Sequence, residues 1–200
     1  MKKIVLGALA LLFSASMFAQ VNMQEKIPFD QSITHVTLDN GMEYFIKSNP
    51  QPENRAELTL VVNAGAVLED EDQQGLAHFC EHMAFNGTKN FPKHELINYL
   101  ESTGMKFGAD VNAYTSFDET VYGITIAMYN EEMLDKGLLV LHDWAHLVSF
   151  EDEEIDAERG VIHEEWRMGQ GAQDRMMRQY LPKIFHNSKY ADRLPIGTMY

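Results

Sequence analysis

The order of strand-like and helix-like segments constrains the fold of this chain more than any other feature. Residues 33–38 and 42–46 alternate loosely between apolar and polar side chains around Asp39-Asn40-Gly41, which is typical of a β-hairpin. Because the later strands and helices do not alternate as βαβ units, the sequence predicts an α+β fold in which an antiparallel β-sheet packs against helices. The expected strands are 56–64, 111–116 and 120–128, and the expected helices are 73–85, about 92–102, 131–148, 152–168 and 173–185, the last bent or ended near Pro182.

The first 19 residues are typical of a secretory signal peptide. A basic start at Met1-Lys2-Lys3 precedes an apolar run at 4–13, and small residues follow up to Ala19, where we expect cleavage. The apolar run is too short to span a bilayer, and no later stretch predicts a membrane span. We therefore expect an exported protein, periplasmic or secreted, with 20–30 as an N-terminal extension and 31–200 as one domain, incomplete at its C-terminus. A buried N-terminal helix is the alternative.

The charge and the cysteine content exclude two further classes of protein. Acidic residues number 30 against 16 basic ones, and the formal net charge of −14 argues against nucleic-acid binding. A single cysteine excludes an intrachain disulfide framework. Stability is therefore expected from packing and from a bound metal.

The segment His78-Phe79-Cys80-Glu81-His82 places metal ligands on the helix expected at 73–85. His78 and His82 lie one turn apart, about 40° from each other on the helix surface, so both imidazoles can reach one zinc ion. Glu81 is offset from them and is predicted to act as general base on a metal-bound water. Leu76, Phe79, Cys80 and Met83 fall on the other side and are expected to face the core. The histidines alone are equally compatible with surface or capping roles.

A third ligand is predicted on the helix expected at 152–168. Its apolar stripe consists of Ile155, Ile162 and Trp166, and Glu158 and Glu165 lie on the flank of that stripe, about 20° apart. Two carboxylates directed toward the protein are costly unless a cation compensates them. We therefore predict Glu165 as the third zinc ligand and Glu158 as the carboxylate that orients His78 or His82. A solvated acidic helix is the alternative.

A second histidine pair and the single cysteine are weaker candidates for metal ligands. His142 and His146 are also four residues apart, but no glutamate lies between them, and their surroundings indicate packing. Cys80 lies about 160° from His78 on the helix and is expected in the core.

Three segments, HFCEHMAFNGTKNFP, ADVNAYTSFDETVY and ERGVIHEEWR, occur in the order found in a known family. Together they resemble the catalytic N-terminal part of the pitrilysin/insulinase family of zinc metallopeptidases, the inverzincins, and in particular its bacterial exported members. The resemblance implies one Zn²⁺ per catalytic domain, held by His78, His82 and Glu165, with Glu81 as the base and Glu158 in support.

The resemblance also implies a substrate and a partner. It places Asn112 and Ala113 where the family contacts the backbone of a peptide or unfolded polypeptide, which would add as a strand to the sheet edge. Family members consist of paired homologous halves, so a second half is expected on the same chain or on a partner subunit. The expected activity is that of a zinc-dependent endopeptidase, with poor cleavage by the isolated 200 residues. A non-catalytic peptide-binding or scaffold half is the alternative, although the ligand set here is intact.

Overall fold

The computed structural model describes residues 26–93, 95–102, 104–106 and 108–198. The expected signal peptide at 1–19 lies outside these residues. The chain divides into two units, with the boundary between Gln51 and Pro52. Each unit is described by itself.

The first unit is the predicted β-hairpin. Strand β1 (Ile33–Thr37) pairs antiparallel with β2 (Glu43–Lys47), with Thr37 opposite Glu43. Gly41 has a φ of 85° in the connecting turn, a left-handed conformation that a glycine adopts without steric cost. Its amide donates to the carbonyl of Leu38 at 2.9 Å.

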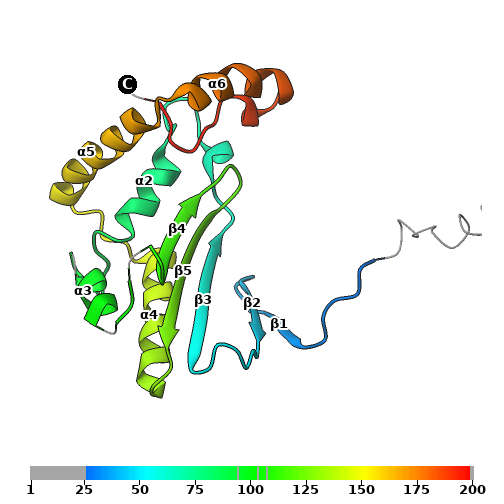
Figure 1. Ribbon diagram of the computed structural model, residues 1–200, viewed down its shortest axis with the longest axis vertical. Helices are drawn as coiled ribbons and strands as arrows, with labels where there is room; N and C mark the ends of the chain where they lie inside the picture. Colours follow the sequence, from blue (N-terminus) through cyan, green and yellow to red (C-terminus); the bar gives the residue numbers. More distant parts are fainter. Residues whose placement is uncertain (1–25, 94, 103, 107, 199–200) are drawn as a thin grey trace, which may run out of the picture. The chain divides into compact units, whose positions relative to one another are not determined.

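The second unit is built on a three-stranded antiparallel sheet with the order β3-β5-β4 (Figure 1). The strands are β3 (Arg55–Val62), β4 (Val111–Thr115) and β5 (Thr120–Ala127). Buried and part-buried residues alternate along β5, and the buried Tyr122, Ile124 and Ile126 pack into the hydrophobic core. This sheet confirms the predicted α+β class.

Helix α4 (Glu131–His146) covers the core face of the sheet and contacts β3 and β5. Its close approach depends on Gly137, where a Cβ atom would lie 2.7 Å from Leu58 Cδ1 and 3.0 Å from Ile126 Cδ1. Val140 and Trp144 of the same helix complete the core.

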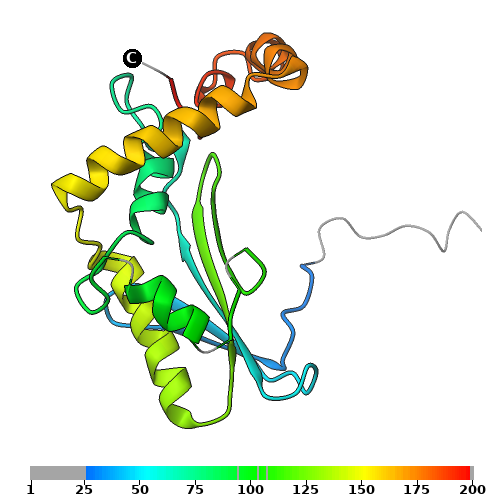
Figure 2. The ribbon, with the colours of Figure 1, turned by 60° about the vertical axis from the view of Figure 1, so that its left-hand side comes forward.

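Of the remaining helices, α2 (Leu76–Met83) lies against the sheet. It contacts both β4 and α5 (Asp152–Gly169), and Figure 2 shows α5 running across α2. The other helical segments are α3 (Glu95–Ser102), α6 (Ala172–Ile184) and the short 3₁₀ turns η1 (Ala66–Leu68) and η2 (Lys189–Ala191). Among the helices within the described ranges, none is long and apolar enough to cross a bilayer.

The structure corrects the prediction for the core side of α2. Met83 is buried, but Leu76 and Cys80 are exposed. The reason is that α2 lies between β4 and α5, so the polar sector of the helix is enclosed and part of its apolar sector faces water. The start of one helix also differs: α2 begins at Leu76, and not at residue 73, because Gly75 has a φ of 97°. The helix expected at 173–185 is found as α6, which does not end near Pro182 but continues to Ile184.

Candidate metal centre

The two histidines of α2 and one glutamate of α5 converge on one point. The Nε2 atoms of His78 and His82 lie 3.7 Å and 3.5 Å from Oε2 of Glu165. One ligand atom from each of the three residues lies within 4.8 Å of the others. A tetrahedral zinc site with bonds of about 2.0–2.1 Å separates its ligand atoms by about 3.3–3.4 Å. The donor set, with its two distances to Glu165 close to this spacing, suits a zinc ion, with the fourth position left to water or substrate.

Glu158 orients His82 and not His78. Its Oε1 lies 2.7 Å from His82 Nδ1, and its Oε2 accepts a hydrogen bond from Asn86 Nδ2 at 2.5 Å. A carboxylate at Nδ1 favours the tautomer with the proton on that nitrogen, which leaves the Nε2 lone pair for a metal. Sequence reasoning missed Asn86, which lies three residues beyond the end of α2, where the helical periodicity no longer places side chains.

Burial prepares His78 as a ligand. Its side chain is only 12% exposed, and burial lowers its pKa, while the carboxylate of Glu165 opposes this shift. The neutral imidazole that results is the form that binds metal. Its Nδ1 is buried and has no hydrogen-bond partner among the residues that the structure describes.

Glu81 is held by the sheet. The residue is 8% exposed, and its Oε2 accepts a hydrogen bond from Thr115 Oγ1 of β4 at 2.7 Å. Behind Thr115 lies Thr120 Oγ1, at 3.5 Å, which donates to the carbonyl of Ala64 at 2.9 Å. Thr115 was not predicted, because a helical wheel of α2 contains no information about its partner strand.

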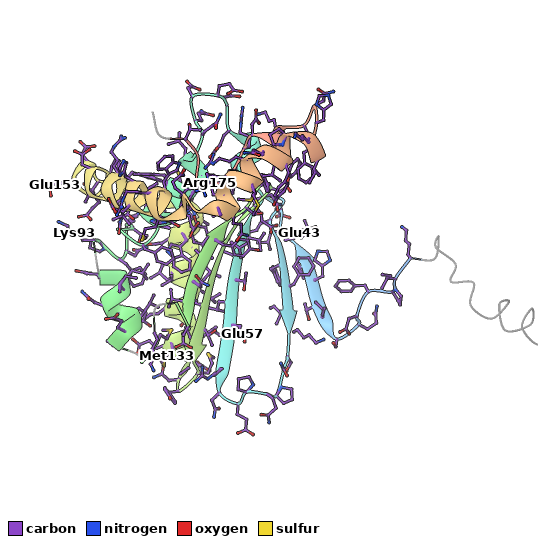
Figure 3. All side chains as sticks on the ribbon, turned by 45° about the horizontal axis from the view of Figure 1, so that its top comes forward. Glu43, Glu57, Lys93, Met133, Glu153 and Arg175 are labelled. Carbon is purple, nitrogen blue, oxygen red and sulfur yellow. The ribbon has the colours of Figure 1, made fainter. Side chains whose placement is uncertain are left out.

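The N-terminus of α5 is fixed by an ion pair. Lys93 Nζ lies 3.2 Å from Glu154 Oε1 and 3.9 Å from Glu153 Oε2, and Figure 3 shows Lys93 and Glu153 near each other at the start of this helix. Glu153 and Glu154 also suit the positive end of the helix dipole. The helix that carries Glu158 and Glu165 is thereby attached to the loop between α2 and α3.

Strand β4 runs beside the site with one edge unpaired within the described part of the chain. Its other edge pairs with β5, with Asn112 opposite Gly123 and Ala113 opposite Tyr122. Asn112 is exposed and Ala113 is half-buried. Through Thr115 the same strand reaches Glu81, so the strand that carries Asn112 and Ala113 lies against α2.

The His142–His146 pair resembles the first pair in geometry but lacks a third ligand. Its ring centroids are 4.4 Å apart at 77°, compared with 4.6 Å and 74° for His78 and His82. Within the described ranges, however, only the His78–His82 pair is joined by a third residue that could hold the same ion.

This fold and this site define a class of protein. Residues 44–197 match the family model described as Insulinase (Peptidase family M16). The chain therefore belongs to peptidase family M16, and the predicted resemblance is confirmed.

The relatives of the chain include named bacterial proteases. It is 40% identical over 191 residues to "Probable zinc protease PqqL" of Haemophilus influenzae, covering 94% of this chain and 21% of that protein. The corresponding Escherichia coli protein is 41% identical over 173 residues, covering 86% and 19%. The crystal structure of the first half of the periplasmic protease PqqL from E. coli matches with a TM-score of 0.82 and 40% identity, covering 87% of this chain and 37% of that one. The chain thus spans about one fifth of the curated relatives it matches.

Proposed function

We propose that this chain provides the zinc site and the general base of an endopeptidase. The observation that carries the proposal is the convergence of His78, His82 and Glu165 around one point, with the buried carboxylate of Glu81 on the same helix. The alternative of a solvated acidic helix does not account for two imidazoles that are only 12% and 23% exposed and lie against its carboxylates. The naming of the relatives as probable zinc proteases supports the same assignment.

Each residue has a distinct chemical task in this proposal. Zinc, when bound, supplies a Lewis acid that acidifies a water and polarises the scissile carbonyl. Thr115 donates a hydrogen bond to Oε2 of Glu81, and we propose that the other oxygen, Oε1, takes the proton of the attacking water. Glu81 then passes this proton to the nitrogen of the departing amine. Glu158 keeps the proton of His82 on Nδ1 throughout.

The unpaired edge of β4 is the proposed binding place for the substrate. An extended peptide that adds as a strand there exchanges main-chain hydrogen bonds with residues such as Asn112 and Ala113. Its backbone then runs past Thr115 toward Glu81. Substrates are accordingly peptides or unfolded polypeptides.

The setting of the domain is also part of the proposal. We infer that it works with a homologous second half, because the chain spans about one fifth of its relatives. We also infer export, from the pattern at 1–19 and from the description of the E. coli relative as periplasmic.

The test combines metal content with peptide hydrolysis. The wild type is expected to hold one zinc per chain, and His78→Ala and Glu165→Ala are expected to lose it. Glu81→Gln is expected to keep zinc while hydrolysis of an unstructured peptide falls by about two to four orders of magnitude. Wild-type protein without zinc, or ligand variants that retain zinc, would overturn the site. Unchanged hydrolysis by the zinc-loaded Glu81→Gln variant would overturn the role of the base.

A further inference from the structure

Helix α2, which carries both histidines, has no cap of its own. Gly75 precedes it without a side-chain cap, and its first turn contains no acidic residue. The first amides of a helix need acceptors from elsewhere. The carboxylate of Glu69 provides them: Oε2 accepts from the amide of Gly75 at 3.0 Å, and Oε1 accepts from the amide of Ala77 at 2.8 Å.

Glu69 is suited to fix the first turn of α2. The residue is only 6% exposed, and both carboxylate oxygens are engaged by backbone amides next to His78. Its negative charge lies at the positive end of the helix dipole. A helix of eight residues has little stability of its own, so its ends decide its orientation.

A distant segment holds Glu69 in turn. The backbone carbonyl of Glu69 accepts hydrogen bonds from Lys189 Nζ at 3.0 Å and from Arg193 Nε at 3.3 Å. Arg193 is 3% exposed, and its Nη2 contacts Glu71 Oε1 at 2.7 Å. The loop before α2 is therefore anchored to residues about 120 positions later in the chain.

Close packing between Gly197 and Gly75 brings the C-terminal segment that contains Arg193 against the start of α2. A Cβ atom on Gly197 would lie 2.6 Å from both the carbonyl oxygen of Gln74 and the Cα atom of Gly75. Because the nearest atoms on both sides belong to the backbone, the distance between residues 74–75 and 197 is closely defined.

The two zinc-binding histidines differ in what orients them. His82 is held by Glu158 through its own ring, whereas the Nδ1 atom of His78 has no hydrogen-bond partner among the described residues. The position of His78 therefore depends on the backbone of the first turn. That backbone is what Glu69 fixes.

We propose that Glu69 is a positioning residue of the metal site, which presets His78 for zinc, and that Arg193 acts through Glu69. The inference rests on the proposed function, because it assumes that zinc is the ligand of His78, His82 and Glu165. It adds a residue outside the histidine motif, nine positions before His78, to the determinants of zinc affinity.

The test is the zinc dissociation constant of the purified chain, measured by competition with a chromogenic chelator. Glu69→Gln replaces one carboxylate oxygen, which accepts a hydrogen bond from a backbone amide, by an NH₂ group that cannot accept one. Zinc affinity is therefore expected to fall about tenfold or more. Glu71→Gln removes the charge of one exposed partner of Arg193, leaves its other exposed partner Asp192 in place, and should stay within about twofold of wild type. Arg193→Met should weaken binding alone but add little in the Glu69→Gln background.

A loss of general stability is separated from a loss of positioning by two further measurements. Val140→Ala opens the core under α4 and serves as a variant with a comparable fall in melting temperature. The visible spectrum of the Co²⁺-loaded protein, which reports ligand geometry, should change in Glu69→Gln and stay as in wild type in Val140→Ala. Arg193→Lys keeps the positive charge but removes the Nε donor to the carbonyl of Glu69. If Glu69→Gln does not fold, both measurements are made on Arg193→Lys instead.

The outcomes distinguish this inference from the proposed function. If the wild type binds no zinc, the proposed function fails. If the wild type binds zinc and Glu69→Gln, or Arg193→Lys in its place, matches its affinity and its Co²⁺ spectrum, the positioning role of Glu69 fails while the zinc site stands.

Discussion

At the scale of single residues, the site contains two carboxylates on α5 with different surroundings. Glu165 is 46% exposed on its side chain and faces both histidines, while Glu158 is mostly buried and bonds to His82. The exposed carboxylate can exchange water for a metal ion. The buried one can only serve its protein partners, His82 and Asn86.

The role of Glu158 predicts a loss of zinc affinity without loss of a ligand. Glu158→Gln is expected to weaken zinc binding by about 10–100-fold, because an amide orients the imidazole of His82 less strongly than a carboxylate. Glu164→Gln, which removes only the exposed partner of Arg167 on the same helix, is the control and should bind zinc as the wild type does. Equal affinities of the two variants in chelator competition would contradict the role of Glu158.

The sequence predicted those site residues that share one helix or lie at regular spacing. His78, Glu81 and His82 follow from one helical turn, and Glu158 and Glu165 from another. Asn86 was missed, because it lies beyond the last residue of α2 and meets Glu158 through a tertiary contact. Thr115 and Glu69 were not accessible, because each acts on α2 through a tertiary contact that no periodicity within one element records.

At the scale of elements, most segments could be predicted because each has a clear apolar period and recognisable ends. The strand β5 and the helix α4 begin where the pattern predicted, at Thr120 and Glu131. The exposed side of α2 could not be predicted, since the pattern of a helix does not show that a second helix will cover its polar side. Leu76 and Cys80 were misplaced for this reason.

A buried aspartate links α4 to the loop after α2. Asp143 is fully buried, and its Oδ2 accepts from Thr88 Oγ1 at 2.6 Å and from the amide of Asn90 at 2.9 Å. Its Oδ1 accepts from Asn90 Nδ2 at 2.7 Å. Burial raises the pKa of Asp143, but the hydrogen bonds from Thr88 and Asn90 outweigh burial, and the net pKa lies below its ordinary value.

This lowered pKa predicts a pH-dependent contribution to stability. Asp143→Asn places an amide against the donors and is expected to lower the free energy of unfolding by about 2–3 kcal/mol at pH 7. The contribution of the carboxylate is complete above its unfolded pKa of about 3.9 and is lost as the pH falls through the lower folded value. The difference between variant and wild type should therefore shrink below about pH 4, in urea unfolding of the metal-free chain.

The control for this measurement is His142→Gln. The ring of His142 is largely exposed and lies 3.4 Å from Asp143, so its loss should change the free energy of unfolding by less than about 0.5 kcal/mol. A difference between Asp143→Asn and wild type that stays constant down to pH 3 would show that the charge of Asp143 does not contribute.

At the scale of the whole molecule, metal binding and turnover are expected to separate. The proposed zinc site joins residues from α2 and α5 of the folded chain, so zinc should raise the melting temperature, and EDTA should reverse the rise. Peptide hydrolysis by the isolated 200 residues is expected to be slow, since the chain spans about one fifth of its relatives. Efficient turnover by the isolated chain that is lost in Glu81→Gln would contradict this expectation.

The proposed addition of substrate to the β4 edge, which has no strand partner within the described residues, has a kinetic consequence for protein substrates. A segment that joins this edge as a strand must first release its own hydrogen-bonded partners, so a folded target is cut only during its local openings. When opening and reclosing are fast, the rate of cleavage follows the open population, and each additional 1.4 kcal/mol or so of local stability slows cleavage about tenfold. Two targets with the same cleavage sequence would then differ in lifetime according to how firmly each is folded around it.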